Sequence, residues 1–149
     1  MKIKSLFVLF LILSSTILFA QNTTVKVFID GSNVGQYTIK NRQTDGGVSF
    51  KKSTYKKLDD LVIEVKGNKL KSAKYYKRSV DITDTDGSSL FVAEEALGLK
   101  GRFVLTDRSV LRKLSKGKVI KLYLQLNPIT YQSKVSSERI YIGSLSTDK

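Results

Sequence analysis

Apolar residues recur at every second position along most of the chain, which is the spacing of strands that bury one face. The pattern is clearest from Val119 to Leu126, and Asn127 and Pro128 are predicted to end that strand. The residues expected on its inner face are Ile120, Leu122, Leu124 and Leu126, and those on its outer face are Lys121, Tyr123 and Gln125. Leu61–Lys66 shows the same alternation and stops at Gly67.

The same criteria predict further strands, separated by short turns that contain Gly, Asp and Asn. They are Thr24–Asp30, Gly35–Lys40, Val48–Phe50, a strand containing Val80 and Ile82, Leu90–Ala93, Arg102–Leu105 and Arg139–Leu145. Hairpins are expected across Asp30–Asn33 and Asp84–Gly87. Lys69–Lys77 is expected to pair with Leu61–Lys66 across the turn between them.

One short helix interrupts this strand pattern. Thr106 or Asp107 offers a side-chain oxygen that can cap its first turn. Val110, Leu111 and Leu114 supply an apolar stripe, and Gly117 is expected to follow the helix end.

Many short strands with closely spaced turns indicate an all-β, mainly antiparallel fold. We predict an immunoglobulin-like β-sandwich with one short helix, and the alternative is an open β-sheet with a single packed helix. The 149 residues suit one domain, because they are too few for two independent hydrophobic cores.

The first 20 residues have the order of charge and hydrophobicity that is typical of a secretory signal. Lys2 and Lys4 precede the apolar run Leu6–Leu13, and the small residue Ala20 is the expected cleavage position. The alternative, an uncleaved anchor, would need about 20 apolar residues. We therefore expect a signal peptide at 1–20, a single β-rich domain at 21–149, no transmembrane segment in the mature chain, and a periplasmic or extracellular location.

The chain contains neither cysteine nor histidine, which excludes disulfides, thiolate metal sites and histidine-based acid–base catalysis. The adjacent acids Glu94 and Glu95 would point to opposite faces of a strand, whereas a catalytic pair must converge. The Asp84–Gly87 region lacks the spacing of a helix-loop-helix calcium site. We therefore expect no enzyme activity, no cofactor and no metal.

The net charge of +13 favours an anionic partner, and cleavage after Ala20 would remove two lysines and leave +11. Anionic glycans, lipid head groups and acidic protein surfaces all fit this charge. Nucleic acid also fits, without a specific signal for it. The alternative is that the excess charge only aids solubility.

Two groups of basic residues are candidates for a polyanion-binding surface. The first interleaves cations with aromatic rings and comprises Lys74, Tyr75, Tyr76, Lys77 and Arg78. The second comprises Arg108, Arg112 and Lys116, which recur every four residues along the helix, with Lys121 on the next strand. The alternative for both groups is an ordinary solvated surface.

These patterns lead to two functional hypotheses. The first is an exported, non-enzymatic binding module with a basic surface for an anionic envelope or extracellular partner. The second is a structural or accessory subunit of a cell-envelope assembly, which would dock through Tyr123, Tyr131 and Tyr141. The mixed stripe of Lys121, Tyr123 and Gln125 resembles the faces of carbohydrate-binding or protein-binding sheets.

Overall fold

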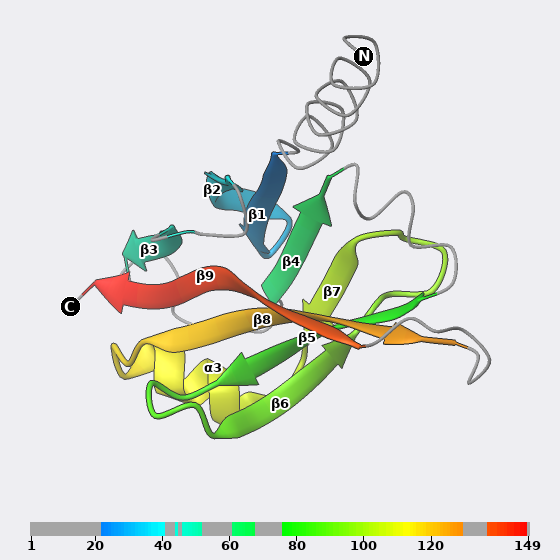
Figure 1. The fold of residues 1–149 in the computed structure, drawn as a ribbon. Coiled ribbons are helices and arrows are strands. Elements are labelled where there is room, and N and C mark those ends of the chain that lie inside the picture. Colours follow the sequence, from blue (N-terminus) through cyan, green and yellow to red (C-terminus); the bar gives the residue numbers. More distant parts are fainter. Residues whose placement is uncertain are drawn as a thin grey trace, which may run out of the picture.

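The computed structural model describes residues 22–40, 44, 46–51, 61–67, 76–129 and 137–148. These residues form nine strands and one helix (Figure 1). The elements are β1 (Thr23–Ile29), β2 (Ser32–Ile39), β3 (Gly47–Lys51), β4 (Leu61–Lys66), β5 (Tyr76–Thr83), β6 (Ser89–Glu94), β7 (Arg102–Leu105), α3 (Arg108–Ser115), β8 (Ile120–Pro128) and β9 (Glu138–Asp148). The predicted signal peptide lies outside the described residues.

The strands form two sheets that face one another. One has four strands in the order β2-β1-β4-β7, and the other has five in the order β3-β9-β8-β5-β6. All pairs are antiparallel except β3 with β9, which is parallel. Figure 1 shows the four-stranded sheet and α3 on the same side of the five-stranded sheet. The other side, which we call the outer face of the five-stranded sheet, carries neither a sheet nor a helix of the described chain.

The core lies between the two sheets and is built from the residues that alternate towards it. Ile63 and Phe103 from the four-stranded sheet and Ile82, Leu122 and Leu145 from the five-stranded sheet are fully buried. This arrangement confirms a mostly β, sandwich-like fold with one short helix. The single open sheet that we considered as an alternative is not formed.

Two strands have the bounds that the alternation predicts, β4 and β7. The predicted end of the Val119–Leu126 strand is wrong, because β8 continues through Asn127 and Pro128. These two residues pair with Lys77 and Tyr76 of β5. Hydrogen-bonded pairing with β5 therefore extends β8 beyond the segment in which apolar and polar residues alternate.

The predicted pairing of Lys69–Lys77 with Leu61–Lys66 is also wrong where the structure tests it. Residues 68–75 lie outside the described part of the chain. Tyr76 and Lys77 pair with β8, whereas β4 pairs with β1 on one side and β7 on the other. The described end of the predicted partner strand therefore belongs to the other sheet.

The helix begins and ends as its sequence predicts. The Asp107 side chain caps α3 by accepting hydrogen bonds from the N–H groups of Ser109 and Val110. Asp107 also accepts a hydrogen bond from the Ser109 hydroxyl. That bond is the main reason why the pKa of Asp107 is lowered, and the bonds from the two backbone N–H groups add to the effect. The predicted stripe of Val110, Leu111 and Leu114 is buried, and Gly117 follows the cap with a positive φ of 73°.

Tyr37 ties the two sheets together at the irregular part of β9. Its hydroxyl donates a hydrogen bond to the carbonyl of Ile142, beside the point where the register of β8 and β9 shifts. A side chain at Gly143 would overlap the Tyr37 hydroxyl, so this glycine makes room for the contact. Burial raises the pKa of Tyr37, and the nearby Tyr141 adds to the shift.

We expect Tyr37→Phe to lower the free energy of unfolding at pH 7 by about 1–2 kcal/mol, because it leaves a buried carbonyl without its donor. The folded protein holds the Tyr37 proton more tightly than the unfolded chain does. The contribution of Tyr37 is therefore complete below the unfolded pKa of about 10 and falls above it by about 1.4 kcal/mol per pH unit. Denaturant unfolding of both proteins from pH 7 to pH 11 should show their difference shrinking above pH 10. A difference that is constant across this range would contradict the assignment.

Candidate functional site

Of the first predicted basic group, the structure describes only the side chains of Lys77 and Arg78. Lys74 and Tyr75 lie outside the described residues, and of Tyr76 only the backbone is described. Lys77 forms a surface ion pair with Glu94 of β6, with an Nζ to Oε1 distance of 2.6 Å and side chains that are 62% and 66% exposed. Its charge is therefore shared with an acidic neighbour.

Arg78 lies inside the fold. Its Nη2 and Nε donate to Oε2 of Glu95 at 2.7 and 3.1 Å, and the two side chains are only 10% and 20% exposed. Oε1 of Glu95 accepts a hydrogen bond from the N–H of Gly101, at the turn into β7. This geometry gives Arg78 and Glu95 a structural role where the two sheets meet.

The second basic group remains exposed. Arg108 and Arg112 lie on the outer side of α3, and Lys116 is its C-cap residue. None of the three forms an ion pair with the residues that the structure describes. They make an amphipathic, solvated helix face, as the spacing predicts.

Lys121 lies beside the β5–β6 turn, close to the helix. Its Nζ donates to the carbonyl of Thr85 at 3.0 Å, and Lys113 of α3 pairs with Asp84 in the same turn. The hydrogen bond from Lys113 is the main reason why the pKa of Asp84 is lowered. The turn thus brings Lys121 and the helix together, whereas Lys77 lies at the opposite end of β5, about 20 Å away at the usual rise per residue. The described side chains of the first group, Lys77 and Arg78, therefore do not meet the second group.

A different cluster occupies the middle of the outer face of the five-stranded sheet. The register places Asp81 of β5 opposite Tyr123 of β8, and Tyr123 opposite Tyr141 of β9. The two tyrosine rings are 5.2 Å apart between centroids and tilted by 51°. Three neighbouring strands therefore contribute one row of polar and aromatic side chains.

Arg139 of β9 reaches across this row. Its guanidinium carbon lies 3.9 Å from the centroid of the Tyr123 ring, and its Nη2 donates to Oδ2 of Asp81 at 2.8 Å. The Asp81 side chain is only 6% exposed, and its Oδ1 accepts a hydrogen bond of 2.6 Å from Ser89. The Arg139 side chain is 46% exposed, so a buried acid holds a cation that remains accessible. We call Asp81, Tyr123, Arg139 and Tyr141 the Arg139 cluster.

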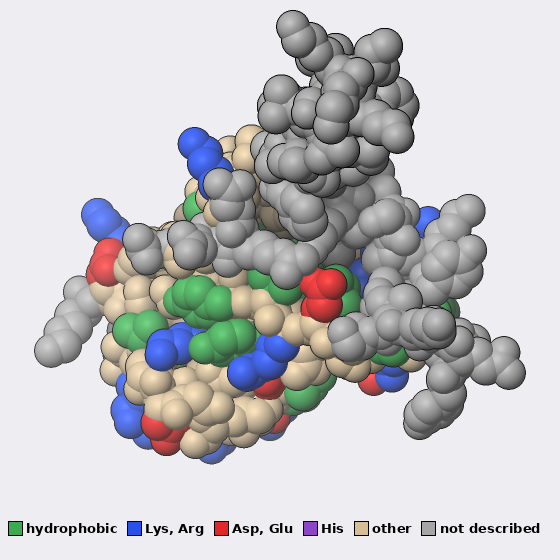
Figure 2. All heavy atoms as spheres, in the orientation of Figure 1, with side chains coloured by type: hydrophobic (Ala, Val, Ile, Leu, Met, Phe, Trp, Pro, Cys, Tyr) green, Lys and Arg blue, Asp and Glu red, His purple; other side chains and the backbone are tan. Residues whose placement is uncertain are grey.

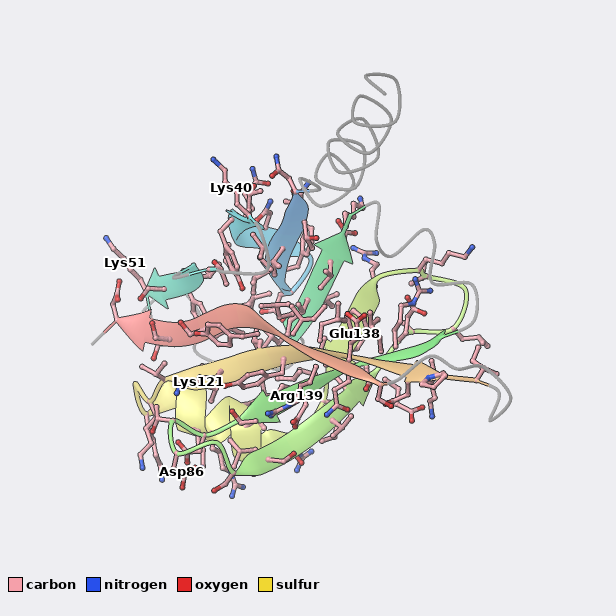
Figure 3. The ribbon with its side chains drawn as sticks, in the orientation of Figure 1. Lys40, Lys51, Asp86, Lys121, Glu138 and Arg139 are labelled. Atoms are coloured by element: carbon pink, nitrogen blue, oxygen red, sulfur yellow. The ribbon has the colours of Figure 1, made fainter. Side chains whose placement is uncertain are left out.

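The surroundings of the Arg139 cluster are mixed in character. Figure 2 shows basic and hydrophobic side chains intermixed on this face. Figure 3 shows Lys121 and Arg139 on the same side of the sheet. Ser79 and Gln125 lie nearby and share a hydrogen bond of 3.4 Å. The face therefore combines cations, aromatic rings and neutral hydrogen-bonding groups.

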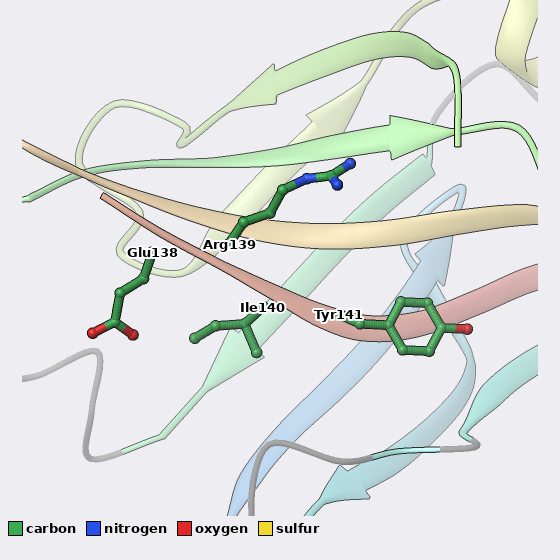
Figure 4. Close-up of a pocket in the computed structure, with 4 residues that line it drawn as sticks. All are labelled: Glu138, Arg139, Ile140 and Tyr141. Atoms are coloured by element: carbon green, nitrogen blue, oxygen red, sulfur yellow. The ribbon is translucent and has the colours of Figure 1, made fainter. Parts of the chain in front are cut away.

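A shallow pocket of about 270 Å³ lies along β9 at one side of the cluster, lined by Glu138, Arg139, Ile140 and Tyr141. Figure 4 shows Arg139 on one side of β9 and Glu138 and Ile140 on the other. The pocket therefore follows the edge of the strand. β3 pairs with β9 only from Ser144 onwards, so within the described residues this edge has no strand partner.

The docking hypothesis drawn from the sequence names Tyr123, Tyr131 and Tyr141, of which Tyr131 lies outside the described residues. Arg139 and Asp81 are not among the predicted site residues. The alternation of polar and apolar residues around a charged residue is the same whether its side chain contacts solvent or another side chain. Asp81 and Arg139 are 58 residues apart in the chain, so no local spacing indicates that they meet.

No three acidic residues within the described segments lie close enough together to hold a metal ion. In those segments no helix is long and apolar enough to cross a membrane.

No protein-family profile matches the chain, and no curated protein matches it significantly.

Proposed function

We propose that the protein is an exported, non-enzymatic binding module that holds an anionic partner on the outer face of its five-stranded sheet. The observation that supports this proposal most directly is Arg139, which is fixed by Asp81 and Tyr123 and still half exposed. A guanidinium whose position is already set loses little conformational freedom on binding.

The charge of the protein supports an anionic partner. Lys121 adds a second cation to the same face, and the whole chain carries a net charge of +13. The partner would be a glycan, a lipid head group or an acidic protein surface of the envelope or the extracellular space. Approach would be guided by the net charge, and the Arg139 cluster would fix the bound position.

The test is binding of the purified protein to an acidic glycan, to vesicles containing anionic lipid and to an acidic protein, each over a range of salt concentrations. We expect saturable binding to at least one probe, which weakens as salt rises. The double variant Lys121→Gln with Arg139→Gln should lose at least tenfold in affinity.

The matched control is Arg108→Gln with Arg112→Gln, which removes the same charge from α3. We expect this control to bind within about threefold of the original protein, because distant charges on the surface are screened. Equal losses in both double variants would show that only net charge matters and would contradict the proposed site.

A second candidate function, an accessory subunit of an envelope assembly, is supported by the loop between β6 and β7. Leu97 is fully exposed and Leu99 is half exposed there. Hydrogen bonds from Leu99 N–H to Ala96 and from Arg102 N–H to Leu99 hold this loop in shape. Docking through such an apolar loop would be insensitive to salt, which distinguishes it from the first candidate.

We also infer that the sandwich has immunoglobulin-like topology. The order β1-β4-β7 in one sheet and β9-β8-β5-β6 in the other corresponds to strands A-B-E and G-F-C-C′ of the variable type. The edge strands β2 and β3 lie outside this correspondence, and the short helix before β8 is a further departure from it. An experimental structure with another order of crossings between the sheets would contradict this inference.

A further inference from the structure

The guanidinium of Arg139 uses only part of its hydrogen-bonding capacity inside the protein. Asp81 accepts a hydrogen bond from one of the two N–H groups of Nη2. Within the described part of the chain, Nε and Nη1 have no acceptor. An arginine offers five N–H donors in one plane, and a parallel pair of donors on neighbouring nitrogens matches the two oxygens of a carboxylate. The second N–H of Nη2 still forms such a pair with an N–H of Nε or of Nη1.

The surroundings restrict how that plane can turn. The Tyr123 ring lies against one face of the guanidinium. Asp81, on the strand beyond Tyr123, accepts a hydrogen bond from Nη2. Asp81 is in turn fixed by Ser89. The remaining donors are therefore presented in a defined direction, which favours a planar, bidentate ligand over a loosely held ion.

The net charge of the site is small. Asp81 offsets the charge of Arg139, and Lys121 contributes one further positive charge on this face. The acidic Glu138 lines the same pocket but lies on the other side of β9 from Arg139. A ligand with one negative charge per binding unit fits this balance better than a densely sulfated polymer or a phosphate cluster, which require several uncompensated cations. A protein–carboxylate contact is therefore favoured over a site for multiple phosphates.

An aromatic surface lies beside these donors. The Tyr123 ring is covered on one face by Arg139, whereas Tyr141 is half buried and borders the pocket along β9. Ring faces carry apolar surface that suits the C–H groups of a pyranose, and Ser79 and Gln125 offer neutral polar groups for hydroxyls.

We propose that the Arg139 cluster recognises a carboxylated sugar of the uronic acid class. Its carboxylate binds to the free edge of Arg139, and its ring packs against Tyr141. This inference rests on the proposed function, because it names the ligand class of the same face. It adds that the cluster selects a carboxylate and not negative charge in general, and that Asp81 is a positioning residue.

The test is calorimetric titration of the purified protein with three probes: galacturonate oligomers, the same oligomers as methyl esters, and a sulfated oligosaccharide of equal length. We expect the galacturonate oligomers to bind at least tenfold more tightly than either of the others. Arg139→Lys keeps the positive charge but removes the parallel N–H donors of the guanidinium. This variant should lose most of the preference for the carboxylate. Asp81→Asn should weaken binding and reduce the preference, with thermal melting to confirm that the variant is folded.

The control variant is Lys121→Gln, which should weaken all charged probes without changing their order. Tighter binding of the sulfated probe, or an unchanged preference in Arg139→Lys, would overturn the carboxylate assignment while leaving the proposed function intact. No binding of any anionic glycan, vesicle or acidic protein would overturn both.

Discussion

Replacing Gly101 by alanine is expected to lower the free energy of unfolding by about 3 kcal/mol. Gly101 has a positive φ of 78°, which costs an L-residue about 1–2 kcal/mol. A Cβ atom there would also lie 2.3 Å from the carbonyl oxygen of Val65. That backbone cannot move away freely, because Val65 N–H donates to the Gly101 carbonyl at 2.7 Å and joins β4 to the turn before β7.

Gly98 is the matched control for this prediction. It lies in the same loop with a φ of 75°, but an added Cβ would meet no atom within 4 Å. We expect Gly98→Ala to lower the free energy of unfolding by about 1–2 kcal/mol, which is the cost of the positive φ alone. Chemical unfolding of the two variants would separate the effects, and equal losses would show that the close approach of Val65 is unimportant.

The second large effect is expected at Arg78. Arg78→Gln should destabilise the fold by about 3 kcal/mol, because it leaves the largely buried carboxylate of Glu95 without its ion-pair partner. The estimate is at the low end for buried pairs because Glu95 is still 20% exposed. Thermal and denaturant unfolding measure the loss directly.

Lys77 provides the comparison, because it forms an ion pair with Glu94, the residue next to Glu95. Lys77→Gln breaks an exposed pair and should change stability by less than about 1 kcal/mol. The folded Arg78→Gln protein should bind anionic probes as well as the original does. Reduced binding with unchanged stability would contradict the structural role of Arg78 and make it a binding residue.

The local elements of this fold could be predicted from the sequence because each depends on nearby residues. Strands β4 and β7 follow from alternation alone, and α3 follows from the Asp107 cap and its apolar stripe. The end of β8 could not be predicted in the same way. Pro128 lies in a strand because β5 pairs with it, which is a property of the partner.

The candidate site depends on contacts that are distant in sequence. Arg139 meets Asp81 and Tyr123 only because β9, β8 and β5 are neighbours, and strand order is not encoded in local spacing. For the same reason, the sequence does not show whether the two predicted basic groups lie near each other. A positive charge in the sequence does not reveal whether an acid such as Glu94 or Glu95 lies opposite it in the fold.

The most direct test of the central claim is to locate the bound ligand. We would follow the backbone and arginine side-chain NMR signals of the purified protein during a titration with galacturonate oligomers, and with the anionic probe that binds most tightly if the oligomers do not bind. The account predicts that the largest shifts occur at Asp81, Tyr123, Arg139 and Tyr141, with little change at Arg108 and Arg112. The largest shifts on α3, with an unchanged outer sheet face, would contradict it.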